Sequence, residues 1–247
     1  MDHKCDEPSE FTHARIQRYY DEVYYKDAAA APTVTGHLHR LARRLDIAPG
    51  TRVLDVACGT GAWLRAAQER GAVVAGIDLS KRAIELCHAQ MPEGEFHVGA
   101  AERLPFRDEQ FDLVTCLGSL EHFLDPVAAL KEMRRVARAK ARFLILVPNS
   151  GFLTRRLGLY RGTWQRTVIE QARSLDEWQG IFRDAGLQVT ERWKDLHVLS
   201  WSWIRRGPWY QIPIRLAQAL LLPIWPLSWQ YQVYHLCVEA DDSHGAC

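Results

Sequence analysis

The stretch VLDVACGTG, at residues 53–61, decides the fold of this 247-residue chain. A short apolar run, residues 52–56, carries Asp55 near its end, and a glycine-rich turn then leads into a helix. Gly59 and Gly61 permit the backbone conformations of a tight turn and the close approach of a ligand. The helix after Gly61 presents unpaired N–H groups and the positive end of its dipole. The turn therefore predicts a binding site for a carboxylate or a phosphate.

The side chains around this turn separate two classes of ligand. A dinucleotide fingerprint needs a third small residue, but the position that follows Gly59 and Gly61 in that pattern is Leu64. Asp55 would repel a pyrophosphate, whereas it suits a ligand that carries an ammonium group. A carboxylate beside a helix N-terminus thus favours an amino-acid zwitterion over a dinucleotide.

A second acidic residue follows in AGIDLS, residues 75–80. Asp78 lies 17 residues after Gly61, at the end of the next apolar run. A carboxylate in that position can accept hydrogen bonds from both hydroxyls of a ribose. Residues 99–106, after a third strand, offer apolar side chains and N–H groups that could hold an adenine. S-adenosylmethionine combines an amino-acid head with a nucleoside and therefore matches this set of contacts.

Short apolar runs alternate with helical patterns along most of the chain, which predicts an α/β domain with a parallel sheet and helices on both faces. The expected strands are 52–56, 72–77, 96–98, 111–116, 142–147, 187–193 and 231–238. The expected helices are 11–26, 34–47, 62–70, 81–90, 126–139 and 175–185.

The motifs VLDVACGTG, AGIDLS, AERLPF, FDLV and LEHF, in this order and spacing, resemble the class I S-adenosylmethionine-dependent methyltransferases, particularly their small-molecule branch. The resemblance covers roughly residues 50–193. It implies a seven-stranded Rossmann-like sheet whose last strand is antiparallel, and S-adenosylmethionine as the cofactor. The implied cofactor residues are Asp55, Gly59 and Gly61 at the methionine part, with Ala57 and the backbone of Thr60 in the same turn, Asp78 at the ribose, Leu79, Ala101 and Glu102 at the adenine, and Leu117 below the sulfonium.

Two positions depart from the family pattern. Many relatives have Asp where this chain has Ala100, so a hydrogen bond to the adenine amino group is either missing or supplied by Glu102. The usual Lys-Pro-Gly-Gly turn before the fifth strand is replaced by Arg138-Ala139-Lys140-Ala141. We expect the connection between that helix and that strand to be closed without glycines.

Two groups of residues have both a catalytic and a structural interpretation. His122 follows the fourth strand, where cofactor and acceptor should meet, so it is the candidate general base; alternatively it caps a helix or packs under the cofactor. Four tyrosines of the N-terminal helix, Tyr19, Tyr20, Tyr24 and Tyr25, are interpreted as a lid. Either one of them, preferably Tyr20, closes over the cofactor carboxylate, or they only pack that helix on the sheet. No metal site is expected, because His37 and His39 are two residues apart and point to different faces of a helix.

The sequence divides into four parts: an N-terminal helical lid (1–48), the cofactor-binding core (49–193), an apolar Trp-rich insertion (194–228), and a final strand with a tail (229–247). The insertion is too short and too broken by proline to cross a bilayer. It is interpreted as a cap, with Trp201, Trp203 and Trp209 lining an apolar pocket. Contact with a membrane interface through residues 201–229, or a plain extension of the core, are the alternatives.

Composition excludes several other functions. With 31 Lys+Arg against 30 Asp+Glu the chain lacks the positive field of a general nucleic-acid binder. The six scattered cysteines form no C-x-x-C pair, and no signal peptide is visible, so a cytoplasmic location is expected.

The predicted activity is O-methylation of a small, apolar or amphiphilic acceptor. The alternatives are C- or N-methylation of a lipid- or glycan-linked substrate, a nicotinamide-dependent oxidoreductase, and a non-catalytic cofactor-binding protein that acts through partners. The oligomeric state is left open.

Overall fold

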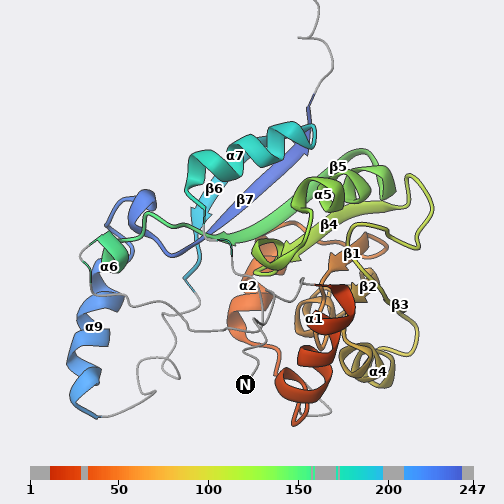
Figure 1. Ribbon diagram of the computed structural model, residues 1–247, viewed down its shortest axis with the longest axis horizontal. Coiled ribbons are helices and arrows are strands. Elements are labelled where there is room, and N and C mark those ends of the chain that lie inside the picture. The colour runs from red at the N-terminus through yellow and green to blue at the C-terminus, as the bar shows by residue number, and fades with distance from the viewer. Residues whose placement is uncertain are drawn as a thin grey trace, which may run out of the picture.

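The computed structural model describes residues 12–28, 33–156, 158, 171, 173–196 and 209–240, and within these residues seven strands form one mixed sheet (Figure 1). The strands are β1 (Arg52–Val56), β2 (Val73–Asp78), β3 (Glu95–Val98), β4 (Phe111–Leu117), β5 (Ala137–Pro148), β6 (Leu187–Lys194) and β7 (Gln232–Glu239). Their order is β3-β2-β1-β4-β5-β7-β6. The first five run parallel, and β7 is antiparallel to both neighbours. The predicted fold class is confirmed.

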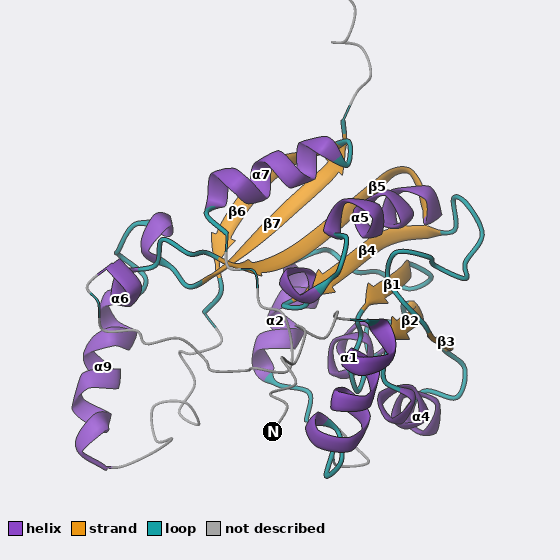
Figure 2. Ribbon diagram, in the orientation of Figure 1, coloured by secondary structure: helices purple, strands orange, loops and turns teal. Residues whose placement is uncertain are grey.

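Helices cover both faces of this sheet (Figure 2). They are α1 (His13–Tyr19), α2 (Gly36–Arg44), α3 (Ala62–Gln68), α4 (Lys81–Gln90), α5 (Pro126–Val136), α6 (Leu153–Arg156), α7 (Leu175–Asp184) and α9 (Ile212–Leu221). Four short turns of helix are η1 (Tyr20–Tyr24), η2 (Leu120–His122), η3 (Trp209–Gln211) and η4 (Leu227–Trp229).

The core consists of two apolar clusters that the sheet separates. Side chains of α5 and α7 pack on one face, and those of α2, α3 and α4 pack on the other. Alternation along β1 explains the division, since Leu54 and Val56 join the first cluster while Val53 joins the second. All three side chains are fully buried, as expected for a central parallel strand.

The junction between α5 and β5 differs from the sequence prediction. The helix ends at Val136 rather than 139, and the strand begins at Ala137 rather than 142. Ala137 takes an extended conformation (ψ 143°) because it pairs with Phe111 at the start of β4. Lys140 adopts a left-handed φ of 67° where the strand register shifts. The expected connection through residues 138–141 is therefore an irregular part of the strand itself.

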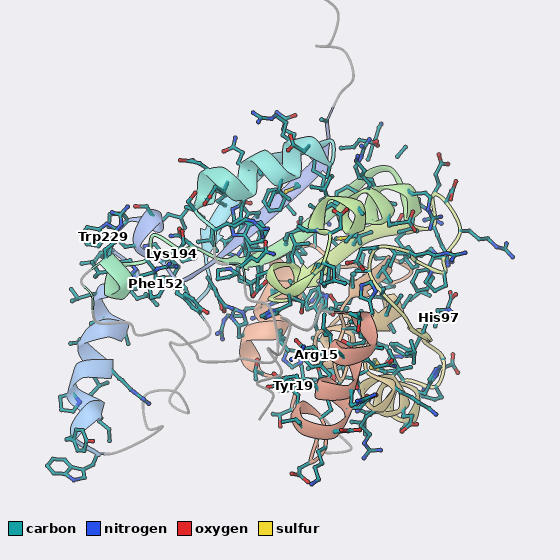
Figure 3. All side chains as sticks on the ribbon, viewed as in Figure 1. Arg15, Tyr19, His97, Phe152, Lys194 and Trp229 are labelled. Carbon is teal, nitrogen blue, oxygen red and sulfur yellow. The ribbon has the colours of Figure 1, made fainter. Side chains whose placement is uncertain are left out.

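The chain between β6 and β7 is held to the end of the sheet by side chains from the core. Lys194 donates from Nζ to the carbonyl oxygens of Leu222 (3.0 Å) and Pro223 (2.9 Å), just after α9 (Figure 3). Asn149 donates from Nδ2 to the carbonyl oxygens of Ser228 (2.8 Å) and Gln230 (3.1 Å). Trp201 and Trp203 lie outside the described residues, so the interpretation of the insertion as a cap stays a prediction. Trp209, the third tryptophan expected to line an apolar pocket, is 80% exposed instead.

Candidate functional site

The turn after β1 forms a cradle of left-handed residues. Ala57, Gly59 and Gly61 have φ values of 61°, 51° and 80°. Left-handed geometry strains alanine, and strain of this kind concentrates at functional sites. Gly61 is the N-cap of α3, and the first N–H groups of that helix therefore face the turn. A Cβ on Gly59 would lie 2.8 Å from the Tyr25 hydroxyl, so the loop and Tyr25 approach as closely as glycine permits.

Asp55 is a buried carboxylate that has no cationic partner among the residues that the structure describes. Its side chain is 4% exposed and, within the described residues, forms no ion pair. Thr115, its register partner on β4, donates from Oγ1 to Oδ1 at 2.6 Å and itself accepts from Trp63 Nε1 at 3.0 Å. Burial raises the pKa of Asp55 to about 7, the Thr115 hydrogen bond lowers it, and the charge of Asp78 raises it further. A cationic ligand group would relieve this unfavourable charge.

Asp78, at the end of β2, closes the cradle from the neighbouring strand. Its two oxygens accept hydrogen bonds from the N–H groups of Gly59 (2.9 Å) and Ser80 (2.8 Å). Each carboxylate oxygen has a second lone pair, so both remain able to accept from a ligand. Burial raises the pKa of this carboxyl as well. The carboxylate thus fixes the loop and also presents acceptors beside it.

Two adjoining cavities meet at these residues. The large cavity, of about 400 Å³, is lined by Asp55 and the glycine loop. The small cavity, of about 70 Å³, is lined by Asp78 and residues of the loop after β3. Residues common to both are Tyr20, Tyr25, Ala57, Ser119 and His122. The two acidic side chains therefore face one continuous site instead of bulk solvent.

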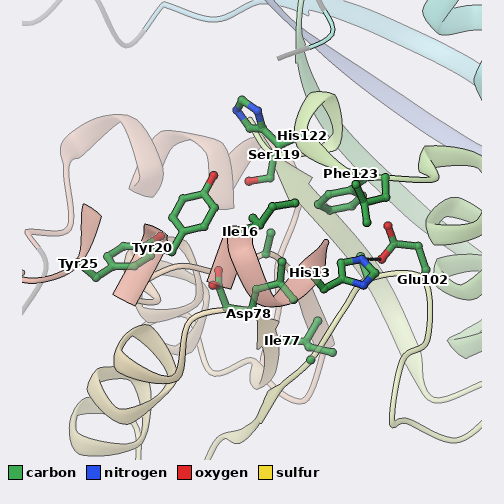
Figure 4. Close-up of a pocket in the computed structure, with 15 residues that line it drawn as sticks. His13, Ile16, Tyr20, Tyr25, Ile77, Asp78, Glu102, Ser119, His122 and Phe123 are labelled. Atoms are coloured by element: carbon green, nitrogen blue, oxygen red, sulfur yellow. Dashed lines mark ion pairs between the residues drawn. The ribbon is translucent and has the colours of Figure 1, made fainter. Parts of the chain in front are cut away.

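The N-terminal segment, residues 12–28, covers this site and is fastened at two points (Figure 4). His13 Nε2 lies 3.2 Å from a carboxylate oxygen of Glu102. Asp21 Oδ1 accepts from Ser80 Oγ at 2.6 Å and from the N–H of Arg82 at 3.2 Å, at the start of α4. Ile16 is buried over the small cavity.

All the predicted site residues except Gly61 line one or both of the two cavities. Asp55, Thr60, Gly59 and Leu117 line the large cavity. Leu79, Ala101 and Glu102 line the small cavity with Asp78, while Tyr20, Ala57 and His122 line both. Gly61 lines neither, because it serves as the N-cap of α3. The assignment of individual roles to these residues stays a prediction.

Sequence reasoning missed several residues of the site, Asp21, Thr115 and Ser119 among them. Burial raises the pKa values of Tyr20 and Tyr25, and the charge of Asp78 raises them further, so both remain protonated phenols that can donate hydrogen bonds. Thr115, a polar residue within the apolar stretch 113–117 of β4, was a visible signal for the partner of Asp55.

Comparison with known proteins gives concordant matches. Residues 54–145 match a family model described as a methyltransferase domain. The chain is 32% identical over 204 residues to the O-methyltransferase cnsE of Penicillium expansum, which covers 75% of this chain and 71% of that protein. It is 30% identical over 166 residues to the uncharacterized methyltransferase YcgJ of Bacillus subtilis (63% of this chain, 65% of that protein).

The crystal structure of YcgJ superposes on this chain with a TM-score of 0.58 and 23% identity, over 83% of this chain and 98% of that one. A ubiquinone biosynthesis O-methyltransferase of Alkalilimnicola ehrlichii is 29% identical over 164 residues (64% of this chain, 66% of that protein).

Proposed function

The chain belongs to the class I S-adenosylmethionine-dependent methyltransferases, and we propose that it methylates a hydroxyl group of a small, apolar or amphiphilic acceptor. Two relatives named above are O-methyltransferases, one of them in ubiquinone biosynthesis, and this supports both parts of the proposal. The alternative is methylation of carbon or nitrogen in a lipid- or glycan-linked acceptor. The experiment below distinguishes transfer to oxygen from transfer to these other atoms.

The residues present fit the cofactor. The buried carboxylate of Asp55, which has no cationic partner among the described residues, would take the ammonium group. The N–H groups at the start of α3 would take the carboxylate, and Asp78 the ribose hydroxyls. Leu79, Ala101 and Glu102 would surround the adenine in the small cavity. Bound S-adenosylmethionine supplies an activated methyl group on a positively charged sulfur.

The observation that carries the acceptor class is the aromatic and apolar part of the lining of the large cavity. Four tyrosines of the N-terminal segment, Tyr19, Tyr20, Tyr24 and Tyr25, line it together with Leu38 and Leu117. Their rings pack against each other, with centroids 4.8 to 5.9 Å apart. Aromatic walls favour planar or apolar ligands, and the phenol groups allow a few directed hydrogen bonds.

The chain's own residues have three tasks in such a reaction. They align the acceptor oxygen with the methyl group, which can contribute on the order of 7–11 kcal/mol. His122, which lines both cavities, would accept the hydroxyl proton as the oxygen attacks. The N-terminal segment would exclude water by closing over the site.

Methyl transfer to paired acceptors tests the proposal. Calorimetry is expected to show binding of S-adenosylmethionine, and 4-alkylphenols are expected to be methylated at least on the order of tenfold faster than 4-alkylanilines of equal chain length. The products are identified by mass spectrometry, with the corresponding methyl ethers as blocked controls. A preference for the anilines would reassign the enzyme to N-methylation. Cofactor binding with no transfer to any acceptor would favour a non-catalytic binding protein.

Loosening the N-terminal segment is expected to accelerate cofactor release. Asp21→Ala removes the acceptor of two hydrogen bonds that tie η1 to α4. Because this acceptor is a charged carboxylate, each bond is worth about 1.5–3 kcal/mol. We expect the dissociation rate of S-adenosylmethionine, measured by stopped-flow displacement, to rise roughly tenfold or more. Glu22→Ala, at the exposed neighbouring position, is the matched control. Equal rates in Asp21→Ala and wild type would show that the segment does not gate the site.

A further inference from the structure

The segment from Trp209 to Ile224 exposes an apolar surface of unusual density. Six of the twelve exposed large apolar side chains among the described residues lie within these sixteen positions: Trp209, Tyr210, Leu216, Leu220, Leu221 and Ile224. Trp209, Leu220 and Ile224 are 80%, 77% and 78% exposed. Leu216 and Leu220, which are four residues apart, share one side of α9, and Ile224 lies in the turn that follows the helix. We call these six residues the α9 face.

The stretch of sequence that contains this face carries side-chain charge of a single sign. Between Asp195 and Glu239 the sequence contains three arginines, Arg205, Arg206 and Arg215, and no acidic residue. The whole chain has a net charge of only +1, so this basic excess is local. Apolar side chains with Trp and Tyr at one end and arginines nearby are the composition of segments that lie in the headgroup region of an anionic bilayer.

The segment is attached to the end of the sheet in a way that leaves α9 available for a surface contact. Lys194 and Asn149 hold the chain after α9 to the ends of β6 and β5. Figure 1 shows α9 at the left end of the molecule, opposite β3 and α4 at the right, and no described residue of 209–231 lines either cavity of the cofactor site. Ten residues of helix span about 15 Å, half of a hydrocarbon core. None of the described helices is long and apolar enough to cross a membrane.

We propose that the α9 face docks the enzyme on the surface of an anionic lipid bilayer, with Trp209, Leu220 and Ile224 inserted among the headgroups. The helix lies in the plane of the interface, and the local excess of arginine in the sequence supplies attraction to the anionic lipid headgroups. Docking requires only this surface, so the proposal does not depend on which acceptor the enzyme methylates. It would also place the enzyme where an amphiphilic acceptor is concentrated.

Vesicle flotation with the full-length protein tests the docking. Vesicles of phosphatidylcholine alone are compared with vesicles that also contain phosphatidylglycerol. The wild type is expected to float with the anionic vesicles, less with the neutral ones, and less at high salt. The double variant Leu220→Ser/Ile224→Ser is expected to lower the partition coefficient roughly tenfold or more, because both side chains lose their apolar burial in lipid.

Matched variants separate docking from unrelated effects. Val98→Ser on β3 changes a half-exposed apolar side chain outside the α9 face, so flotation should not change. Trp209→Ser removes an anchor at the other end of α9 and should weaken flotation independently. Calorimetric binding of S-adenosylmethionine, measured without lipid or acceptor, should be the same in all variants, which keeps this test distinct from that of the methyl transfer.

Three outcomes would overturn the proposal. The first is that the wild type does not float with anionic vesicles. The second is that the double variant floats as well as the wild type. The third is a lipid-free dimer in sedimentation velocity that the double variant dissociates, because the face would then belong to a second copy of the chain.

Discussion

Asp55→Asn is expected to weaken binding of S-adenosylmethionine on the order of a hundredfold or more at pH 8, as measured by calorimetry. The substitution keeps the shape of the side chain and the hydrogen bond from Thr115 Oγ1, but it removes the negative charge that would meet the ammonium group. Loss of one partner from a buried, hydrogen-bonded charge pair costs about 2–5 kcal/mol. Asp108→Asn, which neutralises an exposed carboxylate, is the matched control and should bind normally.

The pH dependence of the same binding follows from the pKa of Asp55. Burial raises this pKa to about 7, so the carboxyl group is increasingly protonated as the pH falls below 7. Only the ionised form attracts the ammonium group. Wild-type affinity is therefore expected to fall with pH below 7, whereas the weak affinity of Asp55→Asn should lack this dependence.

Stability of the cofactor-free protein should change in the opposite direction. The folded-state pKa of Asp55 lies above the ordinary 3.8, so the proton-linked stability is complete below about pH 4 and is lost as the pH rises to 7. Asn is neutral throughout. At pH 8 the free energy of unfolding of Asp55→Asn should thus exceed that of the wild type, and near pH 4 the two should converge. Wild-type affinity in the variant, or a loss of stability at pH 8, would contradict this account of Asp55.

The strand, turn and helix around residues 53–61 were predictable because each depends on local sequence. Three apolar residues within a five-residue stretch set β1, and two glycines set the turn. Ser80 and the helical pattern after it set α4, which begins and ends where predicted, with the Ser80 hydroxyl accepting from the N–H of Ala83. The parallel order of the strands then brings Asp55 and Asp78 to the same edge of the sheet.

The parts that could not be predicted depend on contacts between distant residues. The bond from Ser80 to Asp21 joins positions 59 apart, and nothing in the aromatic N-terminal stretch marks Asp21 as its acceptor. Residues Tyr20–Tyr24 form a wider helical turn, which places Tyr25 against Gly59, and a 3.6-residue period does not foresee that widening. The early start of β5 depends on pairing with Phe111 in the same way.

His122→Gln is expected to lower kcat for the preferred phenol by about 10²–10⁴-fold while leaving the affinity for S-adenosylmethionine within a few fold. The imidazole of His122 is half-buried where the large and small cavities meet, in a lining that it shares with Ser119 and Tyr20. A hydroxyl group is a poor nucleophile until its proton begins to leave, and histidine is the usual acceptor of that proton near neutral pH. Glutamine preserves polarity and approximate size but cannot take up a proton.

A second variant distinguishes proton transfer from packing. His122→Ala leaves space at the junction of the cavities, so added imidazole should restore part of the lost turnover if the ring acts as a base. A histidine that only packs beneath the cofactor would give the reverse pattern, with weaker cofactor binding, an unchanged kcat and no rescue by imidazole. Unchanged turnover in both variants would mean that the hydroxyl proton leaves directly to water. Alignment by the tyrosine-lined cavity and the N-terminal segment would then be the chain's main contribution to the rate.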